Sequence, residues 1–272
     1  MIVNKLTVQS SCCSPNEAVN ESGFSKEIYN FYDSVAKGEG PYNSSENRFS
    51  PQGPTQKIKE YLISGSKKRI LDMGSGMGTT LIGLAKEHTL GKQFIGIDFS
   101  ENMVSKAREN SKELEIELQK KVGFFKGDLK DLPYMDEQFD FAYSECVMNL
   151  VPDREKVISE AYRVLESGGL FVYTDFVSFK PVTDEVREHE GLVCGCRGGS
   201  LSLSENVRIL EKQGFRNIEC IDYSIDKDER DKRLRSEHDS IKEEHQKLVQ
   251  ESPEVAKFID EELGYYLIVA KK

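Results

Sequence analysis

The fold of this chain is decided by the stretch Ile70-Leu71-Asp72-Met73-Gly74-Ser75-Gly76-Met77-Gly78. The apolar residues before the first glycine predict a buried strand, and the G-x-G-x-G spacing predicts a tight turn that leads into a helix. A strand, a glycine-rich turn and a helix form the ligand-binding corner of an open parallel sheet. Glycine suits such a turn because a Cβ would keep the backbone from approaching a ligand closely.

Two acidic residues near this turn indicate which ligand it binds. Asp98 ends the apolar run Phe94-Ile95-Gly96-Ile97, about twenty residues after the turn, where a carboxylate accepts hydrogen bonds from both hydroxyls of a ribose. Asp72 stands just before the first glycine, where it would repel a pyrophosphate and attract a cationic amino-acid end. The spacing also differs from the G-x-G-x-x-G of dinucleotide binders. The turn therefore predicts S-adenosylmethionine in preference to NAD.

Strands and helices alternate along the chain, which predicts an α/β fold with a doubly wound, mostly parallel sheet. We expect seven strands, at 69–73, 93–98, 121–125, 139–143, 169–176, 215–223 and 265–270. We expect helices at 24–37, 55–63, 78–87, 101–119, 153–165 and 204–213. This order resembles the Rossmann-like class I S-adenosylmethionine-dependent methyltransferase fold, in which the last strand runs antiparallel to the others.

Three regions follow from this layout. Residues 1–54 form an N-terminal arm and a capping helix, and residues 55–225 form the cofactor-binding core with a substrate loop at 177–203. Residues 226–272 form a charged helical insertion, expected as an amphipathic helix pair, followed by the final core strand.

The ends of the first four strands supply the remaining cofactor contacts. Met103 and Leu129 would enclose the adenine ring, and Asp128 would accept a hydrogen bond from its amino group. Glu145 ends the fourth strand beside the methyl donor. The expected cofactor-binding residues of these strand ends are Asp72, Gly74, Ser75, Gly76, Gly78, Asp98, Phe99, Met103, Asp128, Leu129 and Glu145.

The composition narrows the partners and the compartment. The 272 residues carry a formal net charge of −10, which disfavours nucleic acid and anionic membranes as partners. No apolar run is long enough to span a bilayer, and the N-terminus lacks the layout of a signal peptide. We expect a cytoplasmic monomer that acts on a small molecule or a metalloid.

The cysteines are distributed in a way that core packing does not explain. Cys146 follows the fourth strand, Cys194 and Cys196 lie on the substrate loop, and Cys12 and Cys13 lie on the N-terminal arm. Thiolates that converge from separate segments on one pocket bind soft, thiophilic centres. Structural zinc is disfavoured because the sequence contains no C-x-x-C pair and no histidine spaced like a ligand beside a cysteine.

Around two of these cysteines the sequence resembles the arsenite S-adenosylmethionine methyltransferases. Glu145-Cys146-Val147-Met148-Asn149-Leu150-Val151-Pro152-Asp153 is similar to the family pattern N-C-V-I-N-L-x-P-D, and E-A-Y-R-V-L-x-x-G-G follows at 160–169. Gly195-Cys196-Arg197-Gly198-Gly199-Ser200-Leu201 is similar to the family segment G-E-C-L-G-G-A-L. The resemblance covers about residues 69–215 and the segment around Tyr32, which is similar to a family helix that caps the cofactor.

The resemblance implies an arsenic site and a chemistry for it. Cys146 and Cys196 would bind trivalent arsenic, with Cys12, Cys13 or Cys194 as a third thiol. The arsenic lone pair would attack the sulfonium methyl group, so that no general base is required. A thiol reductant such as thioredoxin or glutathione would restore the trivalent arsenic or the cysteines.

This sequence departs from the family pattern in three places. Glu145 stands where the family commonly has Asn, residues 37–54 lack the cysteine that the family has after the tyrosine helix, and Cys194 is an additional thiol. Two other functions remain open at this point. One is methylation of a small organic thiol, amine or hydroxyl, and the other is binding of a metalloid by thiols without catalysis.

Overall fold

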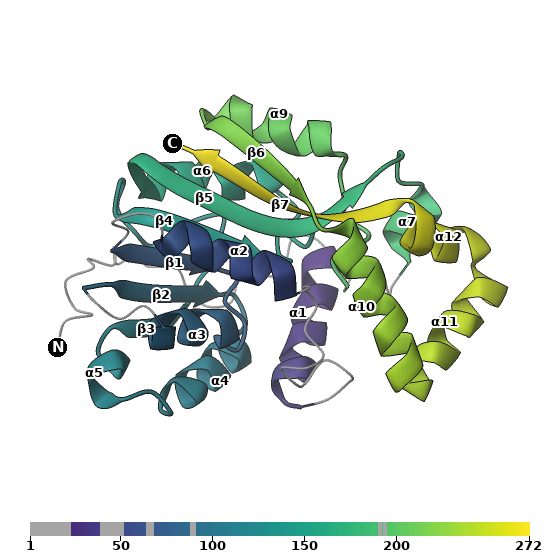
Figure 1. Ribbon diagram of the computed structural model, residues 1–272, viewed down its shortest axis with the longest axis horizontal. Coiled ribbons are helices and arrows are strands. Elements are labelled where there is room, and N and C mark those ends of the chain that lie inside the picture. The colour runs from purple at the N-terminus through teal and green to yellow at the C-terminus, as the bar shows by residue number, and fades with distance from the viewer. Residues whose placement is uncertain (1–22, 39–51, 64–67, 88–90, 190–191, 193–194) are drawn as a thin grey trace.

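One sheet organises the chain in the computed structural model, which describes residues 23–38, 52–63, 68–87, 91–189, 192 and 195–272 (Figure 1). Its seven strands have the order β3-β2-β1-β4-β5-β7-β6. The strands are β1 (Arg69–Met73), β2 (Gln93–Asp98), β3 (Val122–Lys126), β4 (Phe139–Glu145), β5 (Leu165–Ser178), β6 (Arg216–Asp222) and β7 (Leu263–Lys271).

The pairing of the strands confirms the predicted fold class. The pairs β1–β2, β2–β3, β1–β4 and β4–β5 are parallel, whereas β7 is antiparallel to both β5 and β6. The order reverses between β1 and β4, and ligands bind outside the carboxyl ends of the strands at such a switch point.

The described helices lie between these strands or flank the sheet. They are α1 (Gly23–Ala36), α2 (Gln52–Ile63), α3 (Thr79–Glu87), α4 (Glu101–Ser111), α5 (Ile116–Gln119), α6 (Arg154–Val164), α7 (Asp184–Glu188), α9 (Leu203–Gln213), α10 (Ser224–Glu237), α11 (Asp239–Glu251) and α12 (Pro253–Glu261). None of these helices is both long and apolar enough to cross a bilayer.

Alternating side chains of the strands build one apolar layer on each face of the sheet. On one face, Leu71 of β1 packs in a cluster with Ile158 of α6 and Leu210 of α9. On the other face, Ile70 packs with α2, α3 and α4, which contribute Ile58 among others. A period of two along β1 thus supplies both layers of the core.

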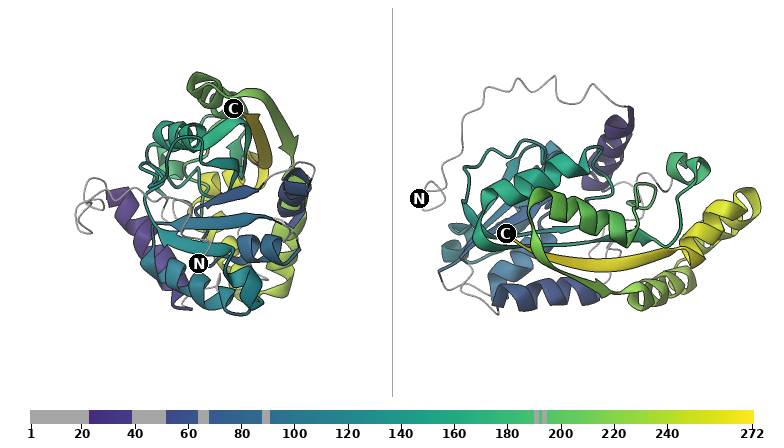
Figure 2. Two further views of the ribbon diagram at one scale, coloured as in Figure 1. Left: turned by 90° about the vertical axis from the view of Figure 1, so that its left-hand side faces the viewer. Right: turned by 90° about the horizontal axis from the view of Figure 1, so that it is seen from above.

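A third apolar cluster lies beyond the carboxyl ends of β4 and β5 and contains both Cys146 and Cys196. It draws residues from α1, from α7 and from α12, which contributes Val255 and Phe258. Figures 1 and 2 show α1 on one side of this end of the sheet and the group α10–α12 at its outer margin. We call this third cluster the thiol cluster.

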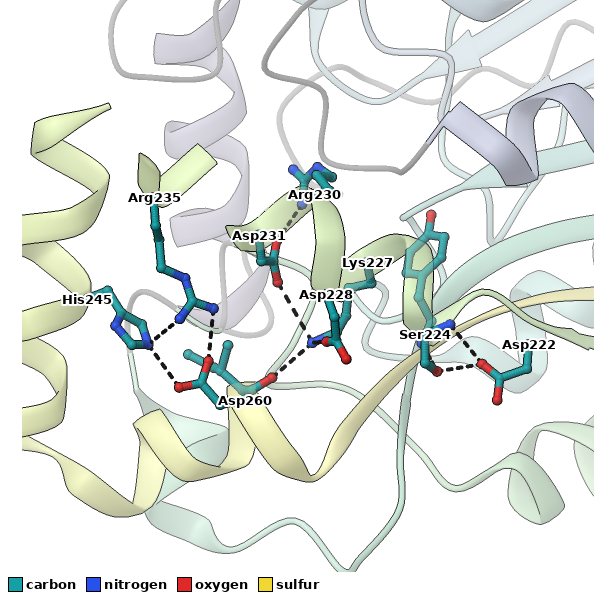
Figure 3. A network of polar contacts seen from close by, with 11 residues as sticks. Asp222, Ser224, Lys227, Asp228, Arg230, Asp231, Arg235, His245 and Asp260 are labelled. Carbon is teal, nitrogen blue, oxygen red and sulfur yellow. Dashed lines mark hydrogen bonds and ion pairs between the residues drawn. The ribbon is translucent and has the colours of Figure 1, made fainter. Parts of the chain in front are cut away.

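The charged segment differs from the predicted helix pair. It forms three helices, because Pro253 occupies the first turn of α12 and starts a new helix there. Polar contacts hold the three together (Figure 3): the buried Lys227 donates to the carbonyl of Ile259 at 3.1 Å, and Arg235 and His245 both contact Asp260. These contacts fix α12 with its apolar face on the thiol cluster.

Two other sequence predictions need correction. The helix expected at 101–119 is interrupted, since α4 ends at Ser111 and the chain turns to bury Leu114 before α5 begins. The strand expected at 169–176 is longer, because pairing starts at Leu165, directly after α6. Within the loop expected at 177–203, the structure has the short helix α7.

Candidate active site

The glycine turn after β1 has the backbone that its sequence predicted. Gly74, Gly76 and Gly78 have φ values of +84°, +50° and +77°, in the left-handed region that favours glycine. A Cβ on Gly74 would meet Val147 at 2.5 Å, whereas a Cβ on Gly76 would meet no atom within 4 Å. Gly76 therefore borders open space on the side where a ligand would lie.

Asp98 shapes this turn from the end of β2. Its carboxylate accepts hydrogen bonds from the amides of Gly76 at 2.8 Å and Ser100 at 3.0 Å. Burial raises the pKa of the Asp98 carboxyl, although both amides act in the opposite direction. The hydroxyl oxygen of Ser75 is buried beside it, and no described residue forms a hydrogen bond with it. Open space, a buried carboxylate and an unpaired hydroxyl fit the ribose of S-adenosylmethionine.

Two further carboxylates line the switch point. Asp72 accepts a hydrogen bond from the Tyr143 hydroxyl at 2.7 Å and is buried. Glu145 accepts from Thr55 of α2 at 2.5 Å and from Thr80 of α3 at 2.6 Å. Two carboxylates at the ends of adjacent strands are suited to the cationic amino-acid end of S-adenosylmethionine.

The adenine side contains the other predicted contacts. Met103 and Leu129 are buried, and Asp128 is partly exposed. Phe99 makes an edge-to-face contact with Tyr29 of α1, with ring centroids 5.5 Å apart. Asp33 of α1 accepts a hydrogen bond from Asn102 of α4 at 2.7 Å. The first described helix thus borders the cofactor pocket.

The structure brings Cys146 and Cys196 together. The Cys196 thiol donates to the carbonyl oxygen of Cys146 at 2.9 Å, and both side chains are buried. Burial raises the pKa of the Cys196 thiol well above its usual value, and a hydrogen bond with the Cys146 thiol raises it further. The two cysteines are thus in direct contact within the thiol cluster.

Both cysteines adopt a backbone conformation that is rare outside glycine. Cys146 has φ +55° and Cys196 has φ +62°, and only Glu137 and Asn217 share this feature among the other described non-glycine residues. Such a conformation costs free energy and persists where the surrounding contacts require it. The strain lies at the two thiols and marks them as a candidate site.

Two tyrosine hydroxyls, one from α1 and one from β7, contact the thiols. Tyr32 of α1 lies 3.4 Å from Sγ of Cys196, and Tyr265 of β7 lies 3.1 Å from Sγ of Cys146. Burial raises the pKa of both phenols well above the usual value. Tyr32, which the sequence assigned to the cofactor, therefore also reaches the thiols, and Tyr265 was not predicted.

A buried polar network connects the two thiol loops. The Asn149 side chain donates to the carbonyl oxygen of Cys196 at 2.9 Å and to Asp175 at 2.8 Å. Arg154 in turn donates to the Asn149 side chain at 2.6 Å and to the carbonyl of Gly199 at 2.8 Å. Asn149 therefore fixes the Cys196 loop against the turn that carries Cys146.

The structure does not describe the other thiols that were predicted for this site. Cys12, Cys13 and Cys194 lie outside the described residues, and Cys220 packs on β6 against a different cluster. Among the described residues, no group of three His, Cys, Asp or Glu side chains has the arrangement of a metal site.

Residues 64–247 match the model of a family described as a methyltransferase domain, and this range is more than half of the chain. The chain belongs to this methyltransferase family. S-adenosylmethionine is the cofactor of the family, and the pocket at the glycine turn is suited to it. A methyltransferase structure from Haemonchus contortus, a phosphoethanolamine N-methyltransferase 2 in complex with S-adenosylhomocysteine, has the same fold, with a TM-score of 0.65 and 21% identity, over 92% of this chain and 58% of that one.

Curated relatives of this methyltransferase confirm the resemblance noted in the sequence. The arsenite methyltransferase of Halobacterium salinarum is 32% identical over 161 residues, which are 59% of this chain and 40% of the relative. The sarcosine/dimethylglycine N-methyltransferase of Halorhodospira halochloris is also 32% identical, over 56% of this chain and 55% of the relative. The chain thus spans about two fifths of the arsenite methyltransferases that it matches.

Proposed function

We propose that this methyltransferase transfers the methyl group of S-adenosylmethionine to trivalent arsenic held by Cys146 and Cys196. The observation that carries the proposal is the contact between two buried cysteines just after β4, where the neighbouring Val147 lies against Gly74 of the glycine turn. The similarity to arsenite methyltransferases supports the same substrate. When bound, S-adenosylmethionine supplies an electrophilic methyl group.

The thiols can take up arsenic without a net exchange of protons. Arsenite at neutral pH is arsenous acid, and each new As–S bond replaces one As–OH bond. Because burial raises the pKa of Cys196, its thiol enters this exchange protonated, and its proton leaves with the hydroxide as water. Two such exchanges would give arsenic bound to Cys146 and Cys196 with two waters released.

The bound arsenic is itself the nucleophile. It carries a lone pair and no proton, so the site needs no general base for the transfer. The residues of the thiol cluster position the arsenic and exclude water, with Phe176, Val255 and Phe258 among them. The fixed position of both thiol loops through Asn149 serves the same purpose.

The direct test is an assay of S-adenosylhomocysteine release with arsenite, methylarsenite and a panel of small thiols and amines. The proposal predicts release that depends on the arsenicals and far exceeds release with any organic acceptor. Turnover of an organic acceptor without any turnover of arsenite would reject it. Arsenite binding without any S-adenosylhomocysteine would instead indicate a binding protein.

A small organic acceptor is the second candidate. The similarity to a sarcosine/dimethylglycine N-methyltransferase, at the same identity as the arsenite methyltransferase, favours it. In that case Cys146 and Cys196 would serve as packing residues of the acceptor pocket, and their replacement by Ser would leave turnover of the amine intact.

A further inference from the structure

An arginine without an ion pair stands next to the thiols. No described acidic residue forms an ion pair or hydrogen bond with the Arg197 side chain, and its Nε is buried without a partner. Other described arginines, such as Arg154, Arg163 and Arg235, contact a carbonyl or a carboxylate. The guanidinium group therefore retains most of its hydrogen-bonding capacity.

The position of this side chain is well defined. The amides of Arg197 and Gly198 both donate to the carbonyl of Leu192, at 3.0 and 2.9 Å, which fixes the backbone. The guanidinium carbon lies 5.1 Å from the centre of the Phe176 ring, a cation–π contact. The same ring packs edge-to-face on Tyr265 at 5.1 Å.

Short contacts lead from this ring to the thiols. The Tyr265 hydroxyl contacts Sγ of Cys146, and Phe176 belongs to the thiol cluster together with Cys196. Arg197 follows Cys196 directly in the sequence. The positive charge is thus held at the margin of the thiol cluster.

We propose that Arg197 is an anion-binding subsite of the acceptor pocket, which recognises a carboxylate on the acceptor or on the small thiol that carries it. A guanidinium group forms two parallel hydrogen bonds with a carboxylate, and such a pair gains strength near apolar surface. The identity of the acceptor as an arsenical rests on the proposed function. The subsite itself is tested without arsenic.

The first test uses two alkylating reagents of similar size, iodoacetate and iodoacetamide. The rate ratio of iodoacetate to iodoacetamide is measured separately at Cys146, Cys196 and Cys220 by peptide mass spectrometry. Arg197→Leu removes the charge and keeps an apolar side chain over Phe176. Its matched control is Arg187→Leu, whose side chain is exposed and which changes the net charge equally.

The proposal predicts that Arg197→Leu lowers the ratio at Cys146 and Cys196 by about tenfold, the scale of one charge-assisted hydrogen bond. The ratio at Cys220 stays unchanged, and Arg187→Leu has less than about a twofold effect at any position. An unchanged ratio at both buried thiols, or an equal loss with Arg187→Leu, would overturn the subsite.

The second test compares phenylarsenite with its 4-carboxy derivative as acceptors. The wild-type protein should have a kcat/KM for the carboxylate at least about fivefold above that for phenylarsenite, and Arg197→Leu should abolish this preference. A preference that survives in Arg197→Leu contradicts the subsite. If wild type turns over neither compound, the arsenite assay decides on the proposed function and the alkylation result decides on the subsite.

Discussion

The cofactor side and the thiol side of this pocket are built in opposite ways. The cofactor side is formed by consecutive strand ends from β1 to β3, and its ligand groups are backbone amides and carboxylates such as Asp98. The thiol side combines β4, the loop after α7, α1 and β7, and it is mostly apolar. One half is local in sequence and polar, and the other is assembled from distant segments.

The two halves are therefore expected to bind different ligands. Under the proposed function, the local polar motifs recognise the cofactor and the assembled half determines the acceptor. Mutations on one side should therefore affect one ligand and leave the other, except where the two halves touch. Gly74 is such a place, because Val147, next to Cys146, lies against it.

The largest separation is expected from Asp98→Ala. The variant loses the carboxylate that would hold the ribose, so affinity for S-adenosylhomocysteine should fall about 100-fold by calorimetry. Arsenical binding at the thiols should stay within about twofold of wild type. A parallel loss of both affinities would mean that the two sides are one cooperative unit.

A pair of glycine substitutions tests the contact between Gly74 on the cofactor side and Val147 on the thiol side. Gly74→Ala places a Cβ 2.5 Å from Val147 at φ +84°, and we expect a loss of about 2–3 kcal/mol in the free energy of unfolding together with weaker binding of both ligands. In the matched control Gly76→Ala, the new Cβ meets no atom within 4 Å. The free energy of unfolding should therefore fall by only about 1 kcal/mol, and only the binding of the cofactor should weaken. Equal urea midpoints for the two variants would refute this contact.

The buried Asp175 gives the thiol side a pH dependence. Burial raises the pKa of this carboxyl to about 7, so the folded chain keeps a proton that the unfolded chain releases near its ordinary value of 3.8. The stability contributed by this group is complete below about pH 4 and is lost as the pH rises to about 7, by at most about 1.4 kcal/mol per pH unit. Asp175→Asn should lack that slope, so in urea titrations the free energy of unfolding of wild type relative to the variant should fall as the pH rises from about 4 to about 7. A slope that persists in the variant assigns it to other groups.

The smallest effect is expected from Tyr265→Phe. It removes the hydroxyl at Cys146 and leaves Thr174 Oγ1 without its donor, so the KM for arsenite should rise about fivefold. The KM for S-adenosylmethionine should not change. Tyr266→Phe is the matched control, because its hydroxyl contacts Asp222 away from the thiols. An equal rise in both variants would assign no role to the Tyr265 hydroxyl.

The predictability of the two halves follows the same division. The glycine turn and Asp98 could be predicted because strand, turn and acid are close in sequence and have one geometry. Tyr265 could not, since a tyrosine in an apolar final strand is indistinguishable from a packing residue until β7 is placed beside β5. Asn149 lay within the quoted motif, but its partners lie 26 and 47 residues away.

The helix pattern shows a similar limit. The segment 226–262 was correctly expected to be helical, yet its apolar face on the thiol cluster was not foreseen, because charged residues dominate its composition. The break after α4 was missed because the residues at 112–115 contain no glycine or proline. The helix ends there because the chain turns to bury Leu114 in the core.

The central claim is that Cys146 and Cys196 together hold the arsenic that accepts the methyl group. It is tested most directly by the rate of arsenite-dependent S-adenosylhomocysteine release in Cys146→Ser and Cys196→Ser, with Cys220→Ser as the matched control. We predict a loss of at least about 100-fold in each of the first two variants, unchanged affinity for S-adenosylhomocysteine, and full activity in the control. Wild-type turnover in either Cys146→Ser or Cys196→Ser would contradict the account.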